Sequence, residues 1–93
     1  MRVIEREMIE AIQKGINWRK DNTQVVQCLQ FDFADVLLHG HSLGCYNYTD
    51  QKFYPSPDTL RQWPTNTTKS RLRALDVDVY TRNHITYLNG HPL

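Results

Sequence analysis

The chain lacks the features that define several common protein classes. Its only two cysteines, Cys28 and Cys45, are too few for a disulfide-stapled mini-domain, so we expect both to be free thiols. No apolar run approaches the roughly 18 residues that a membrane-spanning helix needs. The stretch 1–7 carries glutamates where a secretory signal would carry its apolar run. We therefore expect an intracellular protein without a membrane partner.

A strong net charge is also missing. The formal charge is +1 and the isoelectric point is about 7.8. Such a balance excludes the whole-molecule attraction that draws basic proteins to nucleic acid or anionic lipid, and any partner of that kind must be met by a local patch. With 93 residues and a 40% hydrophobic fraction, the composition indicates a single globular domain over 1–93.

Apolar spacing predicts a first helix over 4–15. Ile4, Met8, Ala11 and Ile12 recur with helical periodicity, and Gly15 can adopt the left-handed conformation that ends a helix. The opposite, solvent-facing side is predicted to carry the polar residues Glu5, Arg6, Glu7, Glu10, Gln13 and Lys14.

After a polar connector, short β-branched and aromatic runs predict an antiparallel meander. Its strands are expected at 23–31, 36–39, 43–48 and 52–54. Three prolines predict that 55–64 has no regular structure. The remaining expected elements are a second helix at about 67–75, a last hairpin that turns around 82–84 between 77–79 and 85–88, and a frayed tail at 90–93. The predicted fold class is α+β, a small antiparallel β-meander sheet packed with two short helices in the order α-β-β-β-β-α-β-β.

The segment Gly40-His41-Ser42-Leu43-Gly44 matches the G-x-S-x-G pattern of hydrolase nucleophile elbows. That motif requires a helix directly after the serine, whereas the residues that follow here favour a strand. We interpret the segment as a hairpin turn and predict no catalytic residue.

His39 and His41 alternate as two metal ligands on one strand face would. A zinc site needs three or four ligands, and neither cysteine has a nearby partner of its own kind. We expect no metal and no cofactor.

Charge is unevenly distributed along the chain. Residues 1–60 hold six basic and eight acidic residues, whereas 61–75 hold four basic residues and no acid. The predicted second helix therefore offers a candidate binding surface for phosphates, although at 100° per residue Arg71 lies on the other flank from Lys69 and Arg73. The candidate residues are Arg61, Thr67, Lys69, Arg71 and Arg73.

Aromatic residues are frequent, and several gather in the predicted hairpin at 43–54. Tyr46 and Tyr48 are candidates for a surface that binds a protein or stacks bases. The alternative is that alternate aromatics of this hairpin fill the core.

The stretch 63–75, with Trp63 at its start, resembles a motif of the form W-x-T-x-T-T-K-S-R-L-x-A-L that is found in a family of small tailed-bacteriophage proteins. The segments 8–12, 15–18, 22–25 and 38–40 add weaker similarity, so the resemblance covers most of the chain. It implies a phage origin and, by itself, no particular activity.

Together these observations favour a non-enzymatic phage accessory protein that binds a host or phage protein, as inhibitors of host defences do, in the cytoplasm of the infected cell. The alternative is a small regulator that binds DNA or RNA through the basic helix at 67–75. A homo-oligomer is compatible with either hypothesis.

Overall fold

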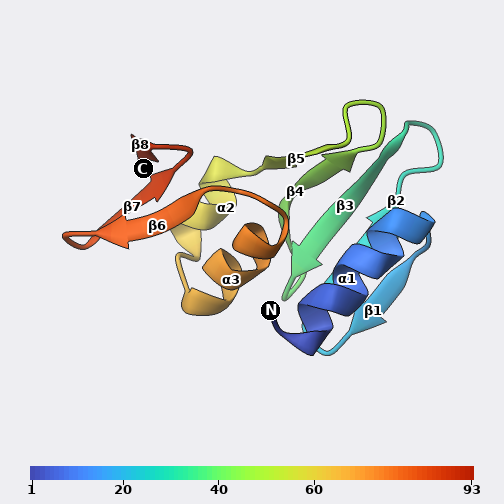
Figure 1. Ribbon diagram of the computed structural model, residues 1–93, viewed down its shortest axis with the longest axis horizontal. Helices are drawn as coiled ribbons and strands as arrows, with labels where there is room; N and C mark the ends of the chain where they lie inside the picture. The colour runs from blue at the N-terminus through green and yellow to red at the C-terminus, as the bar shows by residue number, and fades with distance from the viewer.

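The computed structural model describes residues 1–93 and has an α+β architecture with two antiparallel sheets (Figure 1). Both sheets follow sequence order, β1-β2-β3-β4-β5 in the large sheet and β6-β7-β8 in the small one, which confirms the predicted fold class and meander. The elements are α1 Val3–Lys14, β1 Trp18–Lys20, β2 Thr23–Gln27, β3 Phe33–Leu38, β4 His41–Asn47, β5 Lys52–Pro55, α2 Pro57–Gln62, α3 Asn66–Ala74, β6 Val79–Arg82, β7 Ile85–Leu88 and β8 His91–Pro92.

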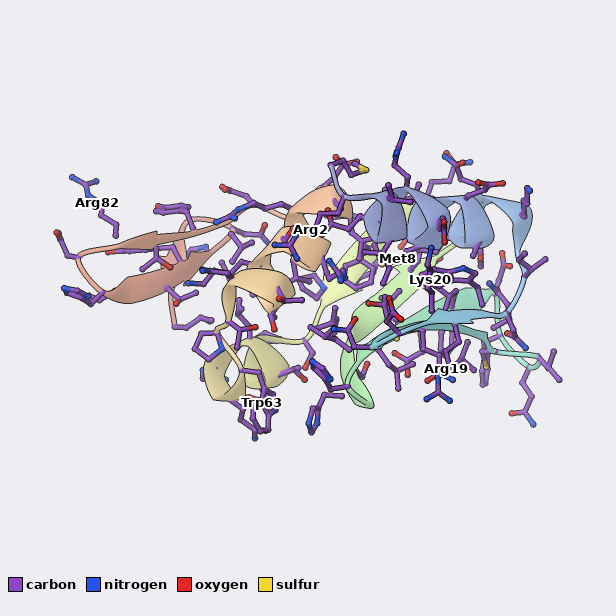
Figure 2. The ribbon with its side chains drawn as sticks, turned by 90° about the horizontal axis from the view of Figure 1, so that it is seen from below. Arg2, Met8, Arg19, Lys20, Trp63 and Arg82 are labelled. Atoms are coloured by element: carbon purple, nitrogen blue, oxygen red, sulfur yellow. The ribbon has the colours of Figure 1, made fainter.

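Helix α1 covers one face of the large sheet, and the opposite face carries no helix (Figures 1 and 2). The helix buries Met8 and Ile12 against the inward side chains of the sheet, among them Val25 and Val36. Gly15 ends the helix as predicted, with a left-handed φ of 66°. The core therefore lies between α1 and the large sheet.

Two-residue turns connect four of the hairpins, and three of these turns share one backbone geometry. In those three turns, His39-Gly40, Asn83-His84 and Asn89-Gly90, both residues have positive φ. This geometry matches the right-handed twist of paired strands, and asparagine, histidine and glycine tolerate it better than most residues. The turn around 82–84 is thus confirmed.

Gly44 permits the close approach of β4 and β5. Its φ is 137°, and a Cβ atom at this position would lie 2.1 Å from the carbonyl oxygen of Tyr54. Any other residue would push the two strands apart, so this glycine sets the position of the β5 edge.

Several predicted boundaries are wrong. Residues 55–64 are not irregular, because Pro57 stands at the first position of α2, where a proline needs no amide donor, and Ser56 caps the helix. The strand predicted to reach residue 31 ends at Gln27. The connector contributes the edge strand β1, and the tail forms β8 instead of fraying.

Helix α3 contacts both α1 and β6, and so links the two sheets. No helix combines the length and apolar character that crossing a bilayer requires.

Candidate functional site

Helix α3 begins with a side-chain cap. The Thr65 hydroxyl accepts a hydrogen bond from the Thr68 amide at 3.1 Å and lies 3.0 Å from the Thr68 hydroxyl. This cap satisfies one of the free amides of the first turn and fixes the direction in which the helix enters the fold. The capped start of α3 in turn fixes where the cationic side chains of the helix lie.

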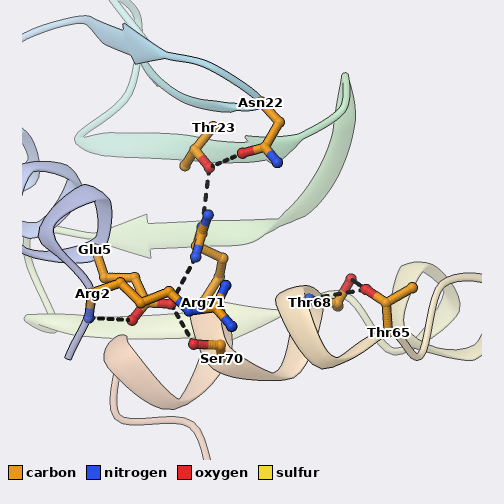
Figure 3. A network of polar contacts seen from close by, with 8 residues as sticks. All are labelled: Arg2, Glu5, Asn22, Thr23, Thr65, Thr68, Ser70 and Arg71. Carbon is orange, nitrogen blue, oxygen red and sulfur yellow. Dashed lines mark hydrogen bonds and ion pairs between the residues drawn. The ribbon is translucent and has the colours of Figure 1, made fainter.

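Arg71 is buried rather than displayed on the surface. Its Nη1 donates to Glu5 Oε2 at 2.8 Å, and its Nε donates to Thr23 Oγ1 at 3.1 Å (Figure 3). Ser70 donates to the same carboxylate oxygen at 2.6 Å. Arg71 and Glu5 are only 3% and 2% exposed. This network ties α3 to α1 and β2.

The environment of Glu5 keeps its carboxylate ionised. Desolvation raises the pKa of Glu5, but hydrogen bonds from Ser70 and Arg71, the backbone of Arg2 and the Arg71 charge outweigh that effect and lower it. A buried ion pair with every partner in place is costly to break, because removing either residue leaves an uncompensated buried charge. The pair therefore supports the fold.

The other cations of the predicted basic surface also have partners. Lys69 is buried and donates to the Thr81 hydroxyl, Arg73 Nε donates to the Val79 carbonyl at 2.9 Å, and Arg61 pairs with Asp58. Lys69 and Arg73 thus fasten α3 to β6. Lys69 and Arg71 are therefore not displayed as the predicted phosphate-binding surface requires, whereas Arg61 and Arg73 remain exposed. Phosphate binding by this segment stays a prediction.

The serine of the G-x-S-x-G segment lies in strand β4. Its hydroxyl donates to Asp35 Oδ1 at 2.6 Å, and the segment as a whole forms a two-residue turn followed by a strand. This arrangement confirms the hairpin interpretation, since a nucleophile elbow would continue into a helix.

The two histidines of the H-x-H pair are exposed at the β3–β4 turn. His41 stacks on Trp63 with 4.7 Å between ring centroids. No group of three histidine, cysteine, aspartate or glutamate side chains is arranged to hold a metal ion.

A groove of about 530 Å³ lies beside α1 and along β5. Its apolar lining comes from four separate parts of the chain. Those side chains are Ile9, Ile12, Tyr46, Phe53, Pro55, Ala74, Leu75 and Val77. The volume falls within the range of roughly 300–1,000 Å³ that is typical of ligand pockets. Of the predicted candidates, this groove contains Tyr46.

Tyr48 contacts two residues that line the groove, Ile12 and Tyr46. Its hydroxyl donates to the Ile12 carbonyl at 2.8 Å, and its ring meets the Tyr46 ring edge-to-face at 5.1 Å. Tyr48, directly after β4, therefore ties this end of the strand to α1 and packs against Tyr46. The aromatic hairpin serves both the core and the groove.

Strand β5 is an edge of the large sheet, and its backbone borders this groove. The Ser56 amide donates to the Leu43 carbonyl at 2.8 Å. In an antiparallel ladder, this bond makes Gly44 and Pro55 a non-hydrogen-bonded pair, and the two pair types alternate along the strands. The pair of Tyr46 and Phe53 is then also non-hydrogen-bonded, so the amide and carbonyl of Phe53 point away from β4.

Comparison with known proteins places the chain among phage proteins. A family model described as "Kyanoviridae Gp96 protein" matches residues 1–92. The chain belongs to this family. The family resemblance inferred from 63–75 is thereby confirmed at the level of a phage protein family. No curated protein and no solved structure matches.

Glu5 of this Gp96-family chain was expected on the solvent side of α1, but it is buried, as Lys69 and Arg71 are. A usable signal was present, because Glu5 lies three residues before Met8 and seven before Ile12, which is the spacing of one helical face. The prediction followed the charge of Glu5, which favours exposure, and not its spacing, which favours burial. The partner that reverses this argument, Arg71, is 66 residues away.

Proposed function

We propose that this phage protein is a non-enzymatic accessory protein that binds a host or phage protein through the groove beside β5, in the cytoplasm of the infected cell. The observation that carries the proposal is the combination of an apolar groove with a free strand edge. An extended segment of a partner can pair with the amide and carbonyl of Phe53 and place alternate side chains in the groove.

The charges around the groove suit a segment of mixed polarity. Lys52 and Asp76 both line it, together with the amides of Gln13, Gln51 and Asn89. Main-chain pairing supplies affinity in this mode of recognition, and pockets for alternate side chains supply specificity. Pro55 and Lys52 also limit indiscriminate pairing at this edge, as prolines and lysines on edge strands do.

The experiment is site-specific photo-crosslinking in lysate of infected host cells. A photoreactive residue replaces Ile9, which lines the groove, and in a matched control replaces Ile16, an exposed apolar residue just beyond α1. We expect one protein to crosslink from position 9 and not from position 16. Hydrogen exchange of the purified complex should then show a protected Phe53 amide.

A partner that crosslinks only from position 16, or that leaves exchange at Phe53 unchanged, would refute the proposed surface. Absence of any protein crosslinked from either position would refute protein binding in infected cells. The proposal does not rest on the cations of α3, of which Lys69 and Arg71 are buried and Arg73 is exposed.

A further inference from the structure

A second cavity of about 270 Å³ lies at the β3–β4 turn, away from the β5 groove. Three segments form it, namely the turn between β3 and β4, α2, and the start of α3. The lining residues that matter here are His39, His41, Trp63, Thr65 and Thr67. From this cavity we infer a binding site for a planar nitrogen heterocycle of the nucleobase class, distinct from the groove.

The aromatic side of the cavity is already arranged for stacking. The imidazole of His41 and the indole of Trp63 lie 25° from parallel, and the indole remains 44% exposed. Trp63 lies on the side of the molecule opposite α1 (Figure 2). A base that stacks on this pair extends an existing stack, and base–aromatic stacking tolerates any of the four bases.

The polar groups of the cavity distinguish a base from a plain hydrophobic ligand. The hydroxyls of Thr59 and Thr65 are bonded to Ser56 and Thr68. The side chains of His39, His41 and Thr67 make no hydrogen bond within the chain. With His41 in the stack, the His39 imidazole and the Thr67 hydroxyl can pair with the ring nitrogens and exocyclic groups of a base, whereas an aromatic protein side chain offers few such partners.

The volume and the neighbouring surface restrict the ligand further. A cavity of this size is slightly smaller than those that hold drug-sized molecules, so it suits one ring system. His39 also borders an adjacent polar pocket that contains Arg19 and Asp21. Arg19 forms no ion pair and points away from α1, as Trp63 does (Figure 2). In this second pocket, the Arg19 guanidinium can pair with a phosphate attached to the bound nucleoside.

The test uses tryptophan fluorescence of the purified full-length protein. Since the chain has two tryptophans, a Trp18→Phe variant leaves Trp63 as the only reporter. It is titrated with AMP, GMP, CMP and UMP, and in a second arm with single-stranded oligodeoxyadenylate and oligothymidylate. We expect saturable quenching by at least one ligand at millimolar concentrations or below. An oligonucleotide that binds more tightly than its mononucleotide identifies nucleic acid as the source of the base, and equal affinities identify free nucleotide.

Variants locate the binding within the cavity. Trp63→Ala should weaken binding about tenfold or more by calorimetry, because the stack is lost. His39→Asn should weaken it severalfold, while His84→Asn, the same change at another turn residue with positive φ but outside the cavity, should have no effect. Circular dichroism confirms that each variant is folded.

Three results would overturn the inference. The first is that no ligand causes saturable quenching or changes the NMR shifts of the amides at 38–41 and 63–68. The second is binding that Trp63→Ala leaves intact. The third is tighter binding of N-acetyltryptophanamide than of any nucleotide. The last would assign the cavity to an aromatic side chain of a protein. Each result is independent of whether the β5 groove binds its partner.

Discussion

The two sheets of this protein depend on different sources of stability. In the large sheet, Val25, Ala34 and Val36 are fully buried beneath α1. The small sheet has strands of four, four and two residues, and only Val79 and Leu88 of its strands are buried. Hydrophobic burial therefore stabilises the first, whereas polar anchors from α3 hold the second. Helix α3 bonds to both sheets, through Arg71 to Thr23 of the large sheet and through Lys69 to Thr81 of the small one.

Breaking the buried pair of Glu5 and Arg71 should cause the largest loss of stability, because this pair lies beside the core under α1. Glu5→Gln leaves Arg71 buried without its counter-charge, and we expect a loss of about 3–5 kcal/mol in the free energy of unfolding. Urea denaturation measures this loss. Glu10→Gln, an exposed glutamate of the same helix, should change the stability little. Similar losses for both variants would contradict the role of the network.

The pH dependence of stability tests the same pair without a change in packing. Because the pKa of Glu5 is lowered in the folded state, its contribution is present above the ordinary carboxyl pKa near 4.5 and is lost as the pH falls through the folded value. The stability difference between the native chain and Glu5→Gln should therefore shrink from pH 7 toward pH 3. A difference that stays constant over this range would show that Glu5 is not the titrating group.

Gly44→Ala tests the close approach of β4 and β5 in the large sheet. The added Cβ would clash with the Tyr54 carbonyl, and we expect a loss of about 2–3 kcal/mol by thermal or urea denaturation. Gly40→Ala is the matched control, since Gly40 also has positive φ but has open space around it. Its cost should be limited to the left-handed backbone, about 1 kcal/mol. Equal costs would mean that the strand contact does not matter.

Lys69→Met should weaken the small sheet selectively. The change keeps the length of the side chain but removes its hydrogen bond to Thr81, and we expect a loss of about 1.5 kcal/mol. Hydrogen exchange should accelerate in β6 and β7 while β2 and β3 keep their protection. Uniform acceleration across both sheets would show that they unfold as one unit and that the comparison between them fails.

Tyr80→Ala should have the smallest effect. Tyr80 and Tyr87 stack across β6 and β7 with 5.0 Å between ring centroids, but Tyr80 is 37% exposed. We expect a loss of about 0.5–1 kcal/mol, again by hydrogen exchange in the small sheet. A larger loss than that of Lys69→Met would assign the stability of the small sheet to its aromatic pair instead of its anchor.

Local sequence signals predicted the elements well where one short segment decides the outcome. The spacing of Met8, Ala11 and Ile12 predicted α1, and the last hairpin was predicted to turn around 82–84, where the turn is Asn83-His84 and Arg82 ends β6. Helix α2 was missed because Pro55 and Pro57 were treated as breakers. The pattern Ser56-Pro57-Asp58 is in fact a regular helix start, with a cap, a proline at the first position and an acid in the first turn.

The candidate site was less predictable, because it depends on contacts between distant segments. Tyr46 was selected from composition, but the opposite wall of its groove comes from 74–77 and from α1. The burial of Arg71 could not be predicted from its charge, because it depends on hydrogen bonds to Glu5 and Thr23, which lie far away in the sequence. Charge along a sequence thus identifies where cations are, and tertiary packing decides whether they face solvent.

The arrangement of contacts also has a consequence for the order of folding. Strands that pair with their sequence neighbours can form from local contacts, whereas the bond between Glu5 and Arg71 closes a loop of 66 residues. If that bond forms after the rate-limiting step, substitutions in it accelerate unfolding and leave refolding nearly unchanged. The buried pair would then determine how long a folded molecule lasts rather than how quickly it arises.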